Sequence, residues 1–325
     1  MSAHPQPDLT VALCGVQLPN PLILASGILG TEAELLARVA RAGAGAVTSK
    51  SCGPQPRAGH PNPTVLAWEH GLINAVGLAN PGVEAEVEEL VRTKALLGLL
   101  GATRPPRPGL IASVFADTVE SFGRVAARVA DAGPDFIEVN ISCPNVHDEF
   151  GTPFAADASA AAEVTAAVKE AVADRVPVLV KLSPNVTDVA AIARAVVGAG
   201  ADALSLINTL TALAVDTETR RPVLANGTGG LSGPAIRPIA VHMVRRVYTE
   251  VARPAGVPVI GMGGIQFAHD AIEFLLAGAT AVAVGTALFV NPRCLAEIRE
   301  GIDEYLARHG HRSVKEIIGA LRAEG

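Results

Sequence analysis

Eight short apolar stretches alternating with amphipathic ones most restrict the fold of this 325-residue chain. The apolar stretches have the length of buried strands and are Leu22–Ala25, Ala46–Ser49, Leu110–Val114, Phe136–Asn140, Val178–Lys181, Ala203–Ile207, Val259–Met262 and Ala281–Val284. Apolar spacing of helical period occupies 31–43, 83–99, 118–131, 157–174, 187–199, 234–253, 268–277 and 292–308. Strands that alternate with helices are parallel, and eight such units predict a closed (β/α)8 barrel, the TIM barrel.

An Ala-Gly pair ends four of the predicted helices, at Ala42-Gly43, Ala132-Gly133, Ala199-Gly200 and Ala277-Gly278. Glycine at this position adopts the left-handed conformation that stops a helix. Its recurrence indicates repeated helix–strand units. A doubly wound sheet would also alternate, but eight units and the lack of an early GxGxxG motif favour the barrel.

Three segments lie outside these units. The apolar runs Leu9–Leu13 and Val16–Leu18 predict a short N-terminal β-hairpin. The block 51–81 is rich in Pro and Gly and too long for a simple connection, which is typical of an inserted active-site loop. Residues 311–323 are expected to form a terminal helix. Because no linker divides the chain, we expect a single domain over residues 1–325.

The predicted strand Phe136–Asn140 runs directly into Ile141-Ser142-Cys143-Pro144-Asn145. Asn140 and Asn145 each carry an amide donor beside a carbonyl acceptor, which suits a flat ring bearing C=O and N–H groups, such as a pyrimidine. Cys143 between them could accept a proton near neutral pH if its pKa were lowered. The alternative is an inert, buried thiol, the usual role of a free cysteine.

Polar residues and glycines occupy the carboxyl ends of the predicted strands, where barrels of this type hold their active sites. These ends are Ser26, Lys50, Ser113, Asn140, Lys181, Asn208-Thr209, Gly263-Gly264 and Gly285-Thr286. A single lysine there is usually a solvated surface residue, but two at equivalent positions favour a shared site. Glycines after strands seven and eight are typical of a phosphate site built from backbone N–H groups. The run Asn226–Gly233 is either a surface loop or a close approach to a ligand at Gly233.

Composition excludes several classes of protein. A net charge of −6 and the lack of a dense basic cluster disfavour a nucleic-acid partner. The four cysteines are scattered without metal-ligand spacing, so we expect no disulfide framework and no metal site, and a cytoplasmic location. No signal peptide or membrane span is expected. Cys14, Cys52 and Cys294 are interpreted as packing or loop residues, and Glu84, Glu86, Glu88 and Glu89 as a solvated helix face.

Four runs together resemble class 1 dihydroorotate dehydrogenases over about Pro19–Pro292. They are Asn140-Ile141-Ser142-Cys143-Pro144-Asn145, Lys181-Leu182-Ser183-Pro184-Asn185-Val186-Thr187-Asp188, Asn226-Gly227-Thr228-Gly229-Gly230-Leu231-Ser232-Gly233-Pro234 and Gly261-Met262-Gly263-Gly264. The second run resembles the 1B subclass, whose catalytic subunit works with an electron-transfer partner. Cys rather than Ser at position 143 separates the chain from the membrane-associated class 2 enzymes.

The resemblance implies an FMN flavoenzyme that oxidises (S)-dihydroorotate to orotate in de novo pyrimidine (UMP) biosynthesis. It implies Cys143 as the catalytic base. The implied FMN contacts are Ser26, Lys50, Ser51, Asn140, Lys181, Ile207, Gly233, Gly263, Gly264, Gly285 and Thr286, with Ser113 where the family usually has Asn near the flavin. The implied orotate pocket contains Lys50, Asn74, Ala75, Val76, Gly77, Leu78, Asn140, Asn145, Asn208 and Thr209. The sequence of loop 146–156 differs from the pattern of the 1B subclass.

Proton removal by Cys143 and hydride acceptance by FMN form the expected mechanism, with Lys50 and Lys181 stabilising negative charge. A Schiff-base aldolase using Lys181 and a flavin subunit that only relays electrons remain alternatives. A dihydrouridine synthase would need a basic surface, which this chain lacks. The electron acceptor stays open between NAD+ through an FAD and iron–sulfur subunit, fumarate and others. We expect a homodimer by default.

Overall fold

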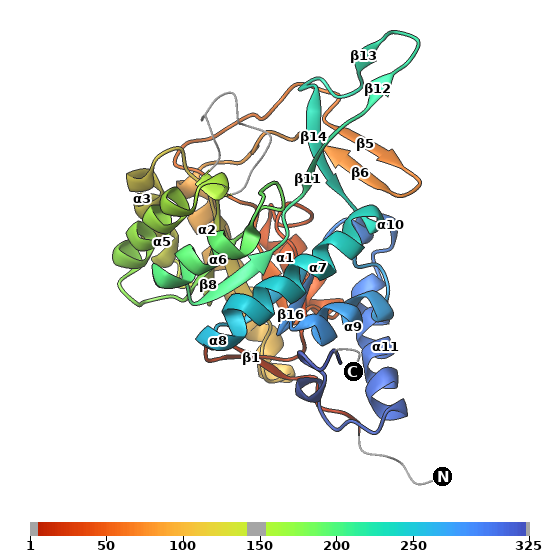
Figure 1. Ribbon diagram of the computed structural model, residues 1–325. Helices are drawn as coiled ribbons and strands as arrows, with labels where there is room; N and C mark the ends of the chain where they lie inside the picture. Colours follow the sequence, from red (N-terminus) through yellow and green to blue (C-terminus); the bar gives the residue numbers. More distant parts are fainter. Residues whose placement is uncertain (1–5, 142–153, 323–325) are drawn as a thin grey trace.

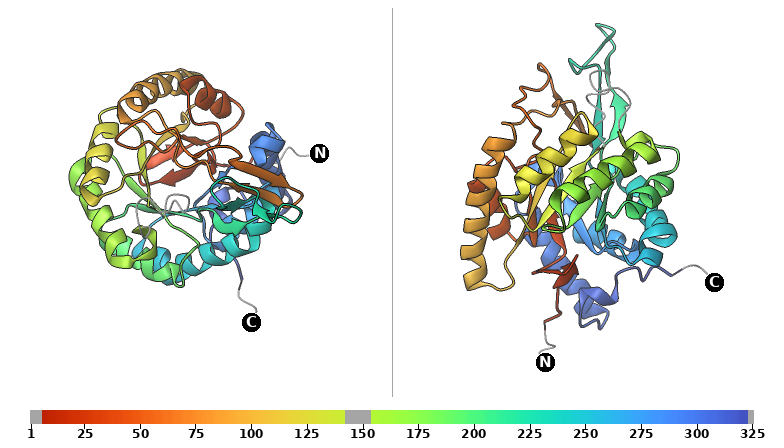
Figure 2. Two further views of the ribbon diagram at one scale, coloured as in Figure 1. Left: turned by 90° about the horizontal axis from the view of Figure 1, so that it is seen from above. Right: turned by 90° about the vertical axis from the view of Figure 1, so that its left-hand side faces the viewer.

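A computed structural model describes residues 6–141 and 154–322 of the chain. Eight parallel strands close into a barrel in the order β10-β15-β16-β3-β4-β7-β8-β9, and Figure 2 shows the ring from above. The strands are β3 (Leu22–Leu24), β4 (Ala46–Thr48), β7 (Gly109–Val114), β8 (Phe136–Asn140), β9 (Val178–Lys181), β10 (Ala203–Leu206), β15 (Val259–Met262) and β16 (Ala281–Val284). The predicted barrel is thereby confirmed, with each predicted strand in its place.

Helices surround the barrel (Figure 1) and follow the predicted stretches closely. They are α1 (Ala33–Arg41), α2 (Val83–Thr103), α3 (Val119–Ala130), α5 (Ala158–Val172), α6 (Val189–Gly198), α7 (Arg237–Val247), α9 (Ala268–Ala277) and α11 (Cys294–Arg308). Shorter turns are η2 (Phe154–Ala156), η3 (Pro234–Ile236), the π-helical η4 (Tyr248–Ala252), α8 (Arg253–Ala255) and α10 (Ala287–Val290). The glycines of the four Ala-Gly pairs all have positive φ, as their stop role requires.

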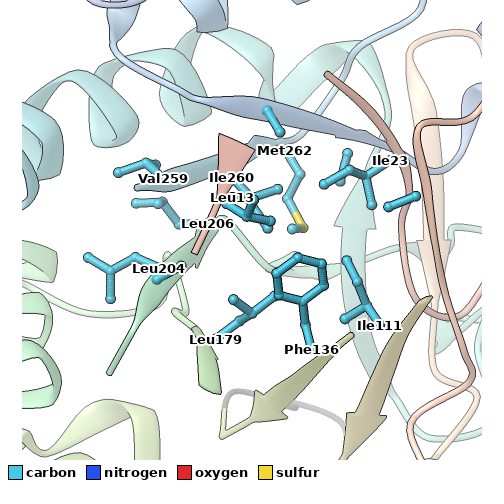
Figure 3. Packing of buried hydrophobic residues seen from close by; sticks show 14 of the residues in the cluster. Leu13, Ile23, Ile111, Phe136, Leu179, Leu204, Leu206, Val259, Ile260 and Met262 are labelled. Atoms are coloured by element: carbon cyan, nitrogen blue, oxygen red, sulfur yellow. The ribbon is translucent and has the colours of Figure 1, made fainter. Parts of the chain in front are cut away.

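The N-terminal hairpin is confirmed as β1 (Val11–Leu13) paired with β2 (Val16–Leu18). It lies at one end of the barrel in Figure 1. Leu13 and Leu18 are fully buried, so the hairpin closes this end with apolar side chains. Leu13 belongs to the same buried cluster as Ile260 of the barrel wall, and both are labelled in Figure 3. Ligands must therefore enter from the opposite end.

Aliphatic side chains fill the lower barrel around one aromatic ring. Phe136, at the start of β8, is fully buried, and Figure 3 shows Ile111, Leu179 and Met262 grouped around it. Successive residues of a strand point to opposite faces. Glu138 and Asn140 therefore follow Phe136 on the inner face, and the strand turns from apolar to polar towards its carboxyl end.

A second sheet stands over the open end of the barrel (Figure 1). Its order is β11-β14-β6-β5, and all its pairs are antiparallel. The block 51–81 supplies β5 (Val65–Trp68) and β6 (Gly71–Asn74), whereas β11 (Leu210–Leu213) and β14 (Thr228–Ser232) follow β10. A two-stranded extension, β12 (Val215–Asp216) with β13 (Arg221–Pro222), projects beyond it.

The run Asn226–Gly233 contains strand β14 and is therefore not an ordinary loop. Its glycines permit close packing of the two layers. A Cβ at Gly230 would collide with the side chain of Thr209, and one at Gly229 would lie 2.7 Å from the carbonyl oxygen of Asn74. At Gly229 and Gly230 the close approach is therefore to other segments of the same chain.

Two expectations were wrong. The terminal helix at 311–323 is replaced by a short 3-10 turn, η5 (Val314–Glu316), and irregular chain through Arg322. The N–H groups of Gly319 and Leu321 donate instead to the last carbonyls of α9, at 2.8 and 3.0 Å. Glu86 is also not solvated: it is 2% exposed, because α2 turns this position towards the barrel while Glu84 and Glu88 face outwards.

Candidate active site

A cavity of about 430 Å³ lies at the carboxyl ends of the barrel strands, under the second sheet. The barrel contributes side chains just where each strand ends, such as Lys50 after β4 and Lys181 at the end of β9. The second sheet contributes Leu72, Asn74 and Ser232. The cavity is therefore bounded by both layers of the fold.

Seventeen of the predicted site residues line this cavity, and they come from seven barrel strand ends and both insertions. They are Ser26, Lys50, Ser51, Asn74, Val76, Gly77, Leu78, Asn140, Lys181, Ile207, Asn208, Thr209, Gly233, Gly263, Gly264, Gly285 and Thr286. Cys143 and Asn145 lie outside the described residues. The structure thus brings together residues predicted from segments far apart in the sequence.

Two predicted residues, Ser113 and Ala75, are buried and do not line the cavity. The Ser113 hydroxyl lies 2.7 Å from Ser51 Oγ and donates to Glu138 Oε1 at 3.3 Å. Ser113 therefore supports a lining residue from behind. Ala75 lies between the lining residues Asn74 and Val76, and its N–H donates to the carbonyl oxygen of Thr64.

A buried ion pair lies in the inner wall of the barrel next to the cavity. Lys181 Nζ is 3.6 Å from Glu138 Oε1, and the two side chains are 8% and 4% exposed. Ser205 donates a hydrogen bond of 3.0 Å to the other carboxylate oxygen. Buried charges need such partners, since an isolated one is costly in the low-dielectric interior. The arrangement presents a compensated cation to the cavity.

Carboxamide side chains form a second part of the wall. Asn208 Nδ2 donates to Asn140 Oδ1 at 3.4 Å, and Asn208 Oδ1 accepts from the backbone N–H of Thr209 at 2.8 Å. Asn74 Nδ2 donates to the carbonyl oxygen of Gly230 at 3.2 Å, which links the two inserted segments. Side chains held in this way can recognise a ring with amide groups, because their donors and acceptors are fixed in direction.

Glycines shape the wall after β15 and β16. Gly263 and Gly264 have φ of 130° and 78°, which other residues rarely adopt. A Cβ at Gly264 would lie 2.8 Å from both the Arg237 Cβ and the Gly233 carbonyl oxygen. Within the described parts of the chain, the N–H groups of Gly263, Gly264 and Gly285 have no hydrogen-bond acceptor. Such unpaired backbone donors suit a phosphate group.

Sequence reasoning did not single out several residues of this site. Ser232 lines the cavity and accepts a hydrogen bond of 2.8 Å from Thr286 Oγ1. Gln266 and Phe289 also line it. Glu138 was missed although a signal existed: it lies two residues before Asn140 in a strand, which places both side chains on one face.

Within residues 6–141 and 154–322, no three His, Cys, Asp or Glu side chains gather as a metal site. The described cysteines lie away from the cavity wall. Burial raises the pKa of Cys14 to about 12 and that of Cys294 to about 11, and raises the pKa of Cys52 well above its ordinary value. These three thiols are therefore unsuited to proton abstraction at neutral pH.

Comparison with known proteins identifies the family of this chain. A family model described as dihydroorotate dehydrogenase matches residues 8–306. The chain belongs to the dihydroorotate dehydrogenase family. The resemblance of the four sequence runs is thereby confirmed, and the chain is an oxidoreductase by family.

Named relatives specify the branch of the dihydroorotate dehydrogenase family. A protein of Geobacter sp. (strain M21) is 46% identical over 97% of this chain and 99% of its own length. Proteins of Geotalea daltonii and Desulforudis audaxviator are also 46% identical, over 98% and 97% of this chain and 99% and 98% of their own lengths. All three are named dihydroorotate dehydrogenase B (NAD(+)), catalytic subunit, which agrees with the expected 1B subclass. None of the described helices is long and apolar enough to span a bilayer.

Proposed function

We propose that this protein oxidises (S)-dihydroorotate to orotate with FMN, as a step of de novo UMP biosynthesis. The family supports the reaction class. The cavity supports the ligands, and this observation carries the proposal: one continuous space is lined by two lysines, several carboxamides and glycine N–H groups that have no acceptor among the described residues. A flat anionic ring and a phosphate-bearing cofactor require these groups together.

The chain's residues fit FMN in two regions of the cavity. Gly263, Gly264, Gly285 and Thr286 would hold the phosphate with backbone N–H groups, since a side chain at Gly264 would close the cradle. The ring system would meet Ser26, Lys50, Ser51, Asn140, Lys181, Ile207 and Gly233, with Ser113 supporting Ser51 from behind. Bound FMN would supply hydride acceptance, while the protein supplies orientation and charge.

The substrate would occupy the part of the cavity between the barrel and the second sheet. Lys50 would pair with the carboxylate of dihydroorotate, because an ammonium group binds an anion strongly where water is excluded. The proposed pocket also contains Asn74, Ala75, Val76, Gly77, Leu78, Asn140, Asn145, Asn208 and Thr209. Amides fixed by the protein would reject ring analogues that lack the matching C=O or N–H groups.

Cys143 is the proposed base, which removes a proton from a ring carbon of dihydroorotate. Cys14, Cys52 and Cys294 do not line the cavity, and burial raises the pKa of each of them. Cys143 follows Asn140, the lining residue at the end of β8, by only three positions. The sequence therefore leaves this one thiol near the site.

A partner subunit is part of the proposal. The relatives are named as catalytic subunits with NAD(+) as acceptor. We infer that electrons leave through a subunit carrying FAD and an iron–sulfur cluster, that two catalytic chains form the core of the complex, and that the enzyme is cytoplasmic.

The test is purification, a visible spectrum and addition of dihydroorotate without air. We expect a yellow protein that bleaches with dihydroorotate. Cys143→Ala should retain FMN and lose at least about 100-fold in turnover, since general bases typically contribute that much or more. A colourless wild-type protein would contradict the FMN assignment. Loss of flavin in Cys143→Ala would make that residue structural.

A further inference from the structure

Glu138 is a buried carboxylate next to the cavity, behind the lining residue Lys181, and the proposed mechanism gives it no role. It is 3% exposed and belongs to β8, two residues before Asn140. Three groups surround it: the Lys181 ammonium at 3.6 Å and the hydroxyls of Ser113 and Ser205 at 3.3 and 3.0 Å. A carboxylate only accepts hydrogen bonds, so both hydroxyls must donate to it.

The donation from Ser113 to Glu138 also fixes the direction of the hydrogen bond between Ser113 and Ser51. Ser113 has a single proton and gives it to Glu138, so its oxygen must accept the 2.7 Å hydrogen bond from Ser51. Ser51 then has no proton for Asn140 and accepts from Asn140 Nδ2 at 3.3 Å. The carboxylate therefore determines which end of the Asn140 amide faces Ser51.

The same orientation follows independently from the other end. The backbone N–H of Thr209 is a donor without ambiguity, so it fixes Asn208 Oδ1 as its acceptor at 2.8 Å. Asn208 Nδ2 then donates to Asn140 Oδ1 at 3.4 Å, which leaves Asn140 Nδ2 towards Ser51. Orientations of amide side chains are normally inferred from a whole network. Here the Glu138 carboxylate at one end and the Thr209 N–H at the other require the same orientation of the Asn140 amide.

We propose that Glu138 is a positioning residue with two effects on the site. It compensates the charge of Lys181, and it sets the direction of the hydrogen-bond chain Ser113–Ser51–Asn140–Asn208. The first effect tunes the reduction of the cofactor, because a charge beside a flavin changes the stability of its anionic reduced form. The second fixes the two amides proposed to read the substrate ring. The inference rests on the proposed function.

Glu138→Gln tests the charge, because it keeps the shape and removes the negative charge. Lys181 is then uncompensated, so reduced FMN is favoured. We expect the reduction equilibrium to shift at least about tenfold, which is about 30 mV for a two-electron couple. The measurement is a dye-coupled redox titration. A shift below twofold, or one in the opposite direction, overturns the proposal.

Asp135→Asn is the matched control. Asp135 directly precedes the same strand and pairs with Arg107 at 2.6 and 2.7 Å, away from the cavity. It loses an equivalent charge, and we expect an unchanged flavin potential. An equal shift in Asp135→Asn would show a general charge effect and overturn the proposal.

Ser113→Ala and Ser205→Ala separate the hydrogen-bond chain from the charge. Both hydroxyls donate to Glu138, but only Ser113 continues to the amides. Ser113→Ala should raise KM for dihydroorotate about fivefold with little change in potential, as one lost hydrogen bond implies, while Ser205→Ala leaves KM unchanged. Equal KM values for the two variants overturn the proposal.

The spectrum distinguishes failure of this inference from failure of the proposed function. A colourless wild-type protein refutes the proposed function. A yellow Glu138→Gln protein with unchanged potential refutes only the inference. If Glu138→Gln yields no flavin-loaded protein, Glu138→Asp decides, because it keeps the negative charge beside Lys181. The proposal requires Glu138→Asp to retain FMN, and loss of FMN there overturns it.

Discussion

The buried carboxyl group of Glu86 lies beside the hydroxyl of Ser49, one residue before Lys50 in the cavity wall. Burial raises the pKa of Glu86 from 4.5 to about 7, and the hydrogen bond from Ser49 offsets only part of this effect. Between these two pH values the folded protein binds more protons than the unfolded chain. Its stability therefore falls as the pH rises through this window.

Glu86→Gln should remove this pH dependence. The difference between the two pKa values corresponds to roughly 3 kcal/mol of unfolding free energy, which the wild type loses between about pH 4.5 and pH 8. Urea unfolding at pH 5 and pH 8 measures this free energy of unfolding. Relative to the wild type, the variant should be more stable at pH 8 than at pH 5. Glu88→Gln, exposed on the same helix, changes the net charge equally and should behave like the wild type. The same pH dependence in Glu86→Gln and wild type would refute the assignment.

Gly264→Ala should strongly weaken the proposed binding of FMN. Its φ of 78° is unfavourable for alanine, and the added Cβ would lie 2.8 Å from Arg237 Cβ. The loop proposed to supply the phosphate N–H groups must shift, since neither the backbone nor a β-carbon can yield easily. We expect a flavin content reduced at least about tenfold in the purified protein, because one misplaced hydrogen bond to a charged group is worth about 1.5 kcal/mol or more.

Gly227→Ala is the control for Gly264→Ala. Its φ of 79° imposes the same backbone strain, but nothing lies within 4 Å of the added Cβ. This variant should keep its flavin and lose about 1–2 kcal/mol of stability. Equal flavin loss in both variants would show that strain, and not the collision, matters.

Alkylation with iodoacetamide at pH 7.5 should modify Cys143 first and inactivate the enzyme. Burial keeps the thiols of Cys14, Cys52 and Cys294 protonated by raising the pKa of each, and the thiolate is the reactive form. Peptide mass mapping identifies the modified site, and orotate should protect it. Labelling of Cys14 before Cys143 would remove the argument for a reactive thiol near the cavity.

The rate of dihydroorotate oxidation should rise with pH under conditions where chemistry limits turnover. A thiol with a pKa near 8.5 is only partly ionised at pH 7, so its conversion to thiolate increases the active fraction. Stopped-flow measurement of flavin bleaching from pH 6 to 9 tests this in the wild type. A flat profile would count against Cys143 as the base.

The barrel could be predicted from the sequence because its signals are local. Each strand is a short apolar run, and each Ala-Gly pair marks the end of a helix by a conformation of its own glycine. The second sheet has no such signal, since β6 and β14 pair over more than 150 residues. The missing terminal helix has the same cause: Gly319 and Leu321 bond to α9, a distant partner.

Cavity-lining residues could be predicted where a polar or charged side chain stands at the carboxyl end of a predicted strand, as for Lys50, Asn140 and Lys181. Glu86 and Glu138 could not be placed in the same way. Glutamate is usually exposed, and only the packing around each side chain shows that it is buried. Ser113 is similar, because its position is a strand end but its hydroxyl turns away from the cavity.

The pairing of Ile73 with Leu231 joins two insertions that flank four barrel strands in the sequence. The roof of the pocket therefore exists only once half of the barrel has closed between them. A chain that ends before residue 228 lacks β14 and cannot form this part of the roof. The enclosed cavity can thus form only after most of the polypeptide has been synthesised, because its lining extends from Ala25 to Phe289.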